Sequence, residues 1–124
     1  MNSKFTKFIR ILLGIILIVF GANKIYSYIP LPRPAQPAID FMDSLADTGY
    51  ILTFVAIVEI IIGFMLILKL WVPFVLILLA PLSLNILLFH LFLNVPLLGT
   101  AILVVILNAI MLYKHRQQYA PLFI

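Results

Sequence analysis

Three ionisable side chains stand within or beside very apolar stretches of this 124-residue chain. Glu59 interrupts "VAIVEIIIGFMLIL", His90 ends "APLSLNILLFH", and Lys24 follows "ILLGIILIVFGAN". A carboxyl, an imidazole and an amine can hydrogen-bond a polar ligand and exchange protons with it. An acidic group inside hydrocarbon costs about 2.5–3.5 kcal/mol on the insertion scale, so we interpret Glu59 first as a functional residue.

Less specific roles compete with this interpretation. Lys24 can extend outward to Asp40 or to a phosphate group, which we favour, or bend inward to Glu59 or to the imidazole. A single histidine in a membrane helix is more often a hydrogen-bonded packing group than a ligand-binding one. For Asn85 and Asn108 we favour interhelical hydrogen-bond clamps, each worth about 0.6 kcal/mol.

The elements that must position these side chains are membrane-spanning helices. The chain is 65% hydrophobic and 10% charged, whereas soluble domains are about half apolar and about a quarter charged. A spanning helix needs about 20 apolar residues. The uncharged run between Lys69 and Lys114 is long enough for two spans, which we expect to turn at "NVPLLGT". We predict an all-α, single-domain bundle (residues 1–124) with spans at about 8–28, 50–68, 71–93 and 97–113, the first retained rather than cleaved as a signal peptide.

Basic residues set the orientation of these spans. They lie before the first span, in the short turn after the second and after the fourth, which predicts that both termini are cytoplasmic. We therefore expect a multi-pass protein of the plasma (inner) membrane. The net charge of +4 is attributed to topology and anionic-lipid contact, and not to nucleic-acid binding.

The first loop is then external. Its prolines at 30, 32, 34 and 37 favour a polyproline II segment. The sequence "AIDFMDSLADTG" predicts a short amphipathic helix across the outer mouth of the bundle, closed by Gly49 in the left-handed conformation.

Depth along the predicted helices brings polar groups together. Glu59, Asn85 and Asn108 lie roughly 12–15 Å below the outer surface, on three different spans. Asn23, Lys24 and His90 form a shallower layer. One conflict arises within the third span, because Asn85 and His90 are roughly 140° apart around an ideal helix. Both point inward only if other helices surround the span widely or if Pro81 bends it; otherwise one of them faces a partner subunit.

The same order of features resembles the DoxX family of small four-helix membrane proteins. The resemblance rests on "RILLGIILIVFGANKIY", "LPRPAQPAIDFMDSLADTGY", "VAIVEIIIGFMLIL", "WVPFVLILLAPLSLNILLFHLFL" and "YKHRQQYAPLF". The residues that match the family pattern are Gly21, Asn23, Lys24, Glu59, Gly63, Pro81, Asn85, Phe89 and His90. The resemblance implies membership of a membrane redox or oxidative-stress complex, since the family takes its name from a small subunit of a thiosulfate:quinone oxidoreductase.

We therefore expect a membrane subunit of a quinone-linked redox system, with a quinone or lipid bound in the outer half of the bundle. The expected ligand-binding residues are Asn23, Lys24, Tyr50, Glu59, Asn85, Phe89, His90, Phe92 and Asn108. Without cysteine, a glycine-rich nucleotide loop or paired histidines, we expect no metal site and no covalently bound cofactor.

Two other functions stay open at this point: a non-catalytic scaffold that docks a partner protein, and proton-coupled passage of a small solute. The ligand, any catalytic activity, a partner oxidoreductase subunit and a homodimer are likewise undecided by the sequence.

Overall fold

The computed structural model describes residues 4–26, 34–95 and 98–124, and within these ranges the regular structure is entirely helical. The helices are α1 (Lys4–Tyr26), α2 (Gln36–Asp47), α3 (Ile51–Ile67), α4 (Val72–Leu93), α5 (Leu98–Lys114) and α6 (Arg116–Tyr119). A short 3-10 helix, η2 (Ala120–Phe123), follows α6. The predicted all-α fold is confirmed.

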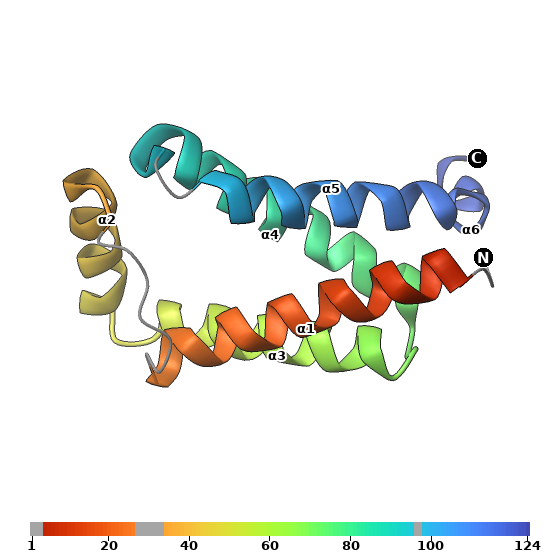
Figure 1. Ribbon diagram of the computed structural model, residues 1–124, viewed down its shortest axis with the longest axis horizontal. Helices are drawn as coiled ribbons and strands as arrows, with labels where there is room; N and C mark the ends of the chain where they lie inside the picture. The colour runs from red at the N-terminus through yellow and green to blue at the C-terminus, as the bar shows by residue number, and fades with distance from the viewer. Residues whose placement is uncertain (1–3, 27–33, 96–97) are drawn as a thin grey trace.

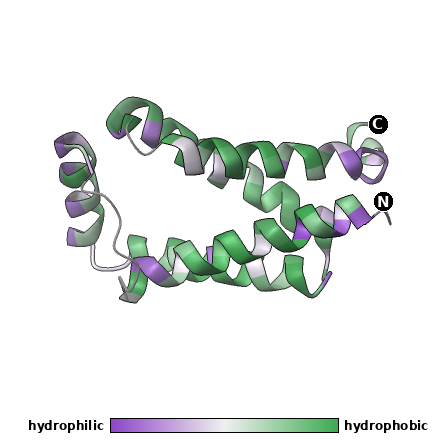
Figure 2. Ribbon diagram, in the orientation of Figure 1, coloured by the Kyte–Doolittle hydropathy of each residue, from purple (hydrophilic) through white to green (hydrophobic). Residues whose placement is uncertain are grey.

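The long helices suit a membrane. By length and composition α1 and α4 can each cross it alone. Helices α3 and α5 have 17 residues each, which gives about 25 Å, the lower end of what a span needs. Each of them adjoins a shorter helical segment across a sharp bend. The bend is 95° between α2 and α3 and 71° between α5 and the segment that follows it. If each bent pair counts as one span, the described residues contain up to four membrane spans. Figure 2 shows hydrophobic residues along these helices and hydrophilic ones mainly near the two ends.

The helices form two close pairs, α1 with α3 and α4 with α5 (Figure 1). Both chain termini lie at one end of the bundle, called here the terminal end, and α2 stands across the opposite end, called the α2 end. This arrangement agrees with the predicted amphipathic helix at a bundle mouth. Its closing residue, Gly49, has φ +84°, the left-handed conformation expected of it.

The predicted polyproline segment is only partly open to comparison. Pro30 and Pro32 lie outside the described residues, as does Tyr28 at the predicted end of the first span. Pro37 was wrongly assigned to that segment, because it lies in the first turn of α2. A proline is well accommodated there, since the first turn of a helix does not use its backbone N–H groups.

The buried core is concentrated toward the terminal end. It consists of Ile9, Leu13, Leu17, Ile62, Leu66, Val72, Val75, Leu76, Leu79, Val104, Leu107 and Met111. These residues come from the first part of α1 and α4 and the last part of α3 and α5. The helices are therefore packed tightly against one another where the termini lie, and the α2 end is the less closely packed half.

Small residues allow the closest helix contact. A methyl group on either Gly14 or Gly63 would lie 2.7 Å from the backbone oxygen of the other, so α1 and α3 touch backbone to backbone there. The end of α3 is also fixed from α1, because the Arg10 guanidinium donates hydrogen bonds to the carbonyls of Leu66 and, at 3.1 Å, Ile67. A cation at a helix C-terminus is favourable, since the carbonyls there have no partner within the helix.

Candidate functional site

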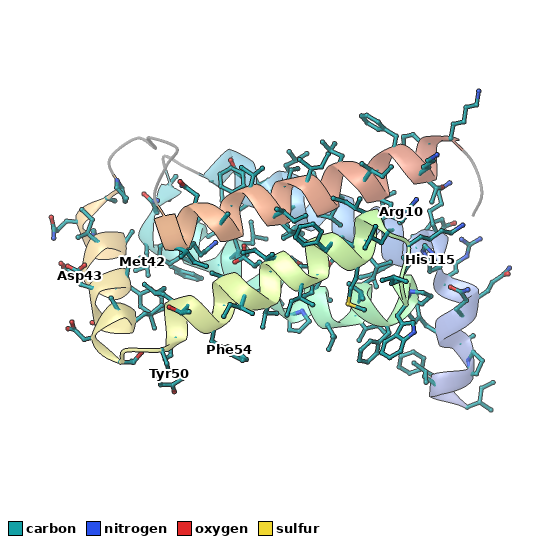
Figure 3. The ribbon with its side chains drawn as sticks, turned by 90° about the horizontal axis from the view of Figure 1, so that it is seen from below. Arg10, Met42, Asp43, Tyr50, Phe54 and His115 are labelled. Carbon is teal, nitrogen blue, oxygen red and sulfur yellow. The ribbon has the colours of Figure 1, made fainter. Side chains whose placement is uncertain are left out.

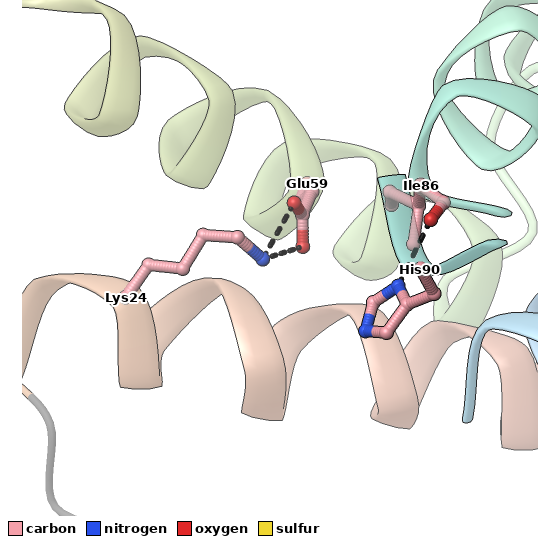
Figure 4. A network of polar contacts seen from close by, with 4 residues as sticks. All are labelled: Lys24, Glu59, Ile86 and His90. Atoms are coloured by element: carbon pink, nitrogen blue, oxygen red, sulfur yellow. Dashed lines mark hydrogen bonds and ion pairs between the residues drawn. The ribbon is translucent and has the colours of Figure 1, made fainter. Parts of the chain in front are cut away.

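An ion pair joins α1 to α3 near the middle of the bundle. The Lys24 amine lies 2.9 Å from Oε1 and 3.1 Å from Oε2 of Glu59, and it donates a hydrogen bond to Oε2 (Figure 4). Glu59 is 1% exposed, and the Lys24 side chain is 29% exposed. The favoured outward orientation of Lys24 was therefore wrong, and its inward alternative is the one that the structure adopts.

Gly21 makes this pairing geometrically feasible. It lies three residues before Lys24 on the same face of α1, and a methyl group there would lie 3.3 Å from the Glu59 Cβ atom. The close approach of α1 and α3 lets the four-carbon stem of the lysine fold across to the carboxylate. Oε1 of Glu59 is buried and accepts no hydrogen bond within the part of the chain that the structure describes, although the nearby ammonium compensates its charge.

The ion pair borders a cavity of about 980 Å³ at the α2 end. Every helix from α1 to α5 contributes to its wall, and most of the lining residues are apolar. The polar lining residues are Asn23, Lys24, Glu59, Asn85, His90, Asn94 and Thr100. Small-molecule sites typically occupy about 300–1,000 Å³ and combine apolar walls with a few placed polar groups, and this cavity fits that description.

His90 enters the wall from α4. Its Nδ1 lies 2.9 Å from the carbonyl oxygen of Ile86 one turn earlier. Because a carbonyl only accepts, Nδ1 carries the proton of this contact and Nε2 is the nitrogen left for a ligand. The ring packs edge-on against Phe89 at 5.1 Å between centroids, and Phe89 lies 5.6 Å from Phe41 of α2. Phe89 thus lies between the imidazole and the aromatic ring that α2 contributes.

Comparison with protein families gives one match: the DoxX family model covers residues 5–91. The chain belongs to the DoxX family. The matched segment contains Lys24, Glu59 and His90, and the resemblance noted from the sequence is confirmed. Comparisons with curated proteins and with solved structures gave no match. DoxX membership establishes a helical membrane protein of this family.

Asn108 serves a different purpose in this DoxX protein. It is 2% exposed, donates from Nδ2 to the carbonyl of Leu76 at 3.3 Å and accepts at Oδ1 from the Ser83 hydroxyl at 3.0 Å. The favoured clamp interpretation of Asn108 agrees with these contacts between α4 and α5, and Asn108 does not border the cavity. Sequence reasoning gave Ser83 no role, although it is a hydroxyl in an otherwise apolar span.

Three other residues expected at the site, Asn85, Phe92 and Tyr50, are exposed at the surface of the bundle. Asn85 borders the cavity but is exposed and forms no interhelical hydrogen bond within the described residues, so its clamp interpretation was wrong. Phe92 also borders the cavity although it is 79% exposed. Tyr50 is 65% exposed at the start of α3 and lies outside the lining, pointing away from the bundle in Figure 3.

A residue that sequence reasoning took only for part of a turn helps to position α2. Asn94, directly after α4, is 3% exposed. Its Oδ1 accepts a hydrogen bond of 3.0 Å from the backbone N–H of Ala35. Ala35 is the N-cap residue of α2. This contact fixes one end of α2 at the cavity, where Phe41, Met42 and Leu45 complete the wall. An isolated polar residue between a long apolar helix and a proline was the only signal for it.

Proposed function

We propose that this DoxX protein binds a quinone, or a lipid of comparable shape, in the cavity at the α2 end, as the membrane subunit of a quinone-linked redox system in the plasma membrane. The observation that carries the proposal is the Lys24–Glu59 ion pair in the wall of a largely apolar cavity. An apolar cavity alone would suit any acyl chain, whereas a polar pair within it selects for a ligand with a polar head.

The charges favour an uncharged head group. Lys24 and Glu59 neutralise one another, so the wall has no net charge there and gives no strong attraction to an anion or a cation. A quinone head has two carbonyl acceptors and a flat ring. The ammonium of Lys24 has three donors, and Phe41 and Phe89 supply flat apolar surface.

Side chains in the same wall can supply the protons that quinone reduction requires. Reduction of a quinone to a quinol takes up two electrons and two protons. We assign the electrons to a partner subunit that has its own redox centre. Both protons are assigned to Nε2 of His90, which takes up a proton, passes it to a quinone oxygen and is reprotonated from water for the second transfer. Lys24 donates hydrogen bonds to the ligand and keeps its protons. Glu59 then holds the lysine at the ligand and stabilises its charged form.

Filling the cavity tests this function. Val55 borders the cavity one turn before Glu59, and Ile57 is 46% exposed on the outer face of the same helix. We expect Val55→Trp to weaken binding of decylubiquinone to protein in phosphatidylcholine nanodiscs by at least about tenfold, because the indole occupies ligand volume. The matched variant Ile57→Trp should bind as the wild type does.

The readout is a binding titration of each purified protein, with empty nanodiscs as the blank for partitioning into lipid. Glu59→Gln should also weaken binding, since hydrogen bonds that involve charged groups are worth about 1.5–3 kcal/mol. Equal binding by wild type, Val55→Trp and empty nanodiscs would contradict the proposal and favour a scaffold that docks a partner protein.

A further inference from the structure

A second cleft lies at the opposite end of the molecule. It has a volume of about 520 Å³ and is formed by the start of α1, the turn between α3 and α4, and the residues that follow α5. Its basic lining residues are Lys4, Lys7, Arg10, Lys69 and His115. Figure 3 shows Arg10 and His115 together at this terminal end, far from Asp43 on α2.

No acidic side chain balances the three lysines and the arginine of this cleft. The chain has four acidic residues, and all of them lie between positions 40 and 59, on α2 or in the wall of the other cavity. The lining of the cleft contains neither aspartate nor glutamate. Like charges gathered in one concave site repel each other, and an anion in that site relieves the repulsion.

Two of the basic groups in the cleft, Arg10 and His115, are buried and held in place, whereas its three lysines are exposed. Arg10 is 8% exposed and is held by its hydrogen bonds to the end of α3. His115 is 9% exposed, and its Nδ1 lies 2.9 Å from the carbonyl of Met111. Lys69 and Trp71 adopt positive φ angles of 59° and 49°, a conformation that non-glycine residues rarely adopt and that often marks functional sites.

Apolar groups stand beside the charges. Trp71 is 72% exposed, and with Val72 and Pro73 it lines the same cleft. Tryptophan at the end of a membrane span is typical of the lipid headgroup level. The cleft thus offers cations for a phosphate and an adjoining apolar surface for the start of an acyl chain.

We infer that this cleft binds the phosphate group of an anionic membrane lipid. Guanidinium and ammonium groups are the side chains that bind phosphate oxygens, and basic pockets between membrane helices bind anionic headgroups in this way. Free phosphate shares the same chemistry, whereas a neutral lipid headgroup gives the cations no net charge to bind. The inference is independent of any ligand in the cavity at the α2 end.

The single tryptophan of the chain provides the test. Trp71 fluorescence is recorded in nanodiscs that contain increasing fractions of brominated phosphatidylglycerol or brominated phosphatidylcholine. We expect stronger quenching by phosphatidylglycerol at equal fraction, since a bromine-bearing lipid held in the cleft stays next to the indole. Lys7→Gln and Lys69→Gln should each lower the preference for phosphatidylglycerol by about tenfold, because each removes a charge-assisted hydrogen bond to the bound phosphate.

Lys114→Gln is the matched control. Lys114 lies at the same end, where its amine stands 5.8 Å from the Phe5 ring centroid, but it is not part of the cleft. Its loss removes the same charge and should leave the preference unchanged. An equal effect of Lys114→Gln would overturn the inference, because it would show diffuse attraction.

Adding sodium phosphate to the nanodiscs distinguishes a lipid headgroup from free phosphate as the bound group. Sodium sulfate at the same ionic strength is the reference. Relief of phosphatidylglycerol quenching by phosphate alone supports the site and extends it to the free anion. If phosphatidylglycerol still quenches Trp71 more strongly than phosphatidylcholine in the presence of phosphate, the site is assigned to the lipid. Absence of any preference for phosphatidylglycerol, with no effect of phosphate, would overturn the inference.

Discussion

Each charged residue in the interior of this bundle has a partner from another helix. Lys24 of α1 pairs with Glu59 of α3, and Arg10 of α1 binds the carbonyls at the end of α3. Charges removed from water must be compensated in this way, because an unpaired buried ion loses its hydration energy with nothing in return. The α1–α3 pair is therefore held by polar contacts at two levels, in addition to its glycine contact.

Removal of Lys24 should show how much a buried Glu59 without a partner lowers the free energy of unfolding. We expect Lys24→Met to lower the free energy of unfolding by about 2 kcal/mol, between the values of exposed and fully buried pairs, because Glu59 then stays buried without a cation. The double variant Lys24→Met/Glu59→Gln should recover part of that loss. Equilibrium unfolding of the purified variants in mixed micelles measures both, and a double variant no more stable than the single one would contradict this interpretation.

The sequence indicated Glu59 and His90 but could not decide the direction of Lys24. An acid within an apolar run is visible in any reading of the chain, since its cost does not depend on the neighbours. A lysine near a span end has a stem long enough to reach either the interface or the interior. The choice depends on how closely α1 and α3 approach at Gly21, and that distance is a property of the packed pair.

The α1–α3 contact depends on two positions that have no side chain, Gly14 and Gly63. A methyl group on Gly63 would meet Ile18 Cγ1 at 2.6 Å and the Gly14 carbonyl at 2.7 Å. Backbone atoms cannot yield as a flexible side chain can, so the two helices would have to separate. Separation would also lengthen the gap that Lys24 spans to reach its partner.

We therefore expect Gly63→Ala to destabilise the protein by about 1–3 kcal/mol and to weaken the ion pair. The control is Gly99→Ala at the start of α5, where an added methyl group would meet nothing within 4 Å and should be neutral or slightly stabilising. Unfolding midpoints of the two alanine variants give the comparison. Equal stability of both would show that the backbone contact is not limiting.

The C-terminal segment has its own attachment. The Tyr119 hydroxyl donates a 2.7 Å hydrogen bond to the carbonyl of Pro73 at the start of α4. We expect Tyr119→Phe to cost about 1 kcal/mol locally and to speed amide hydrogen exchange in α6 and η2 with little change elsewhere. Unchanged exchange in these residues would contradict the assigned role.

Alkaline pH should weaken the same attachment, the hydrogen bond between Tyr119 and Pro73. Burial raises the pKa of Tyr119 above the ordinary value of 10.0, so the phenol stays protonated in the folded protein where it would ionise in the unfolded one. The stabilising contribution is fully present below about pH 10 and is lost as the pH rises through the raised pKa. The exchange of α6 in the wild type should approach that of Tyr119→Phe only above that range.

The elements themselves followed largely from the sequence, whereas contacts between distant residues did not. Apolar run length, the break near Pro96 and the pattern of α2 depend on local rules, and the helices formed accordingly. The hydrogen bond from Ala35 to Asn94 and that from Ser83 to Asn108 join residues far apart in the chain. Such pairs depend on the rotation of each helix about its axis, which the weak amphipathicity of a membrane helix does not specify.

Packing and charge are both divided along the bundle axis. The core and the basic cleft occupy the terminal end, and the cavity, the ion pair and all acidic residues occupy the middle and the α2 end. Basic residues remain preferentially on the cytoplasmic side. This division therefore predicts that the α2 end faces the outside, where the cavity is accessible from the outer half of the membrane.

Cysteine labelling tests this orientation, since the chain has no cysteine of its own. Asp43 is exposed on the face of α2 that points away from the bundle (Figure 3). We expect Asp43→Cys to react with a membrane-impermeant maleimide in intact cells, and Gln118→Cys at the terminal end to react only after the membrane is opened. The opposite pattern would place both termini outside.

Ligand binding in the cavity at the α2 end can be tested directly by identifying the lipids that copurify with the protein. Lipid extracts from purified wild type, Val55→Trp and Ile57→Trp are compared by mass spectrometry at equal protein. We expect a quinone or another small lipid, retained near one per protein by wild type and Ile57→Trp and depleted in Val55→Trp. The same composition in all three extracts would contradict a ligand-binding cavity bordered by Lys24 and Glu59.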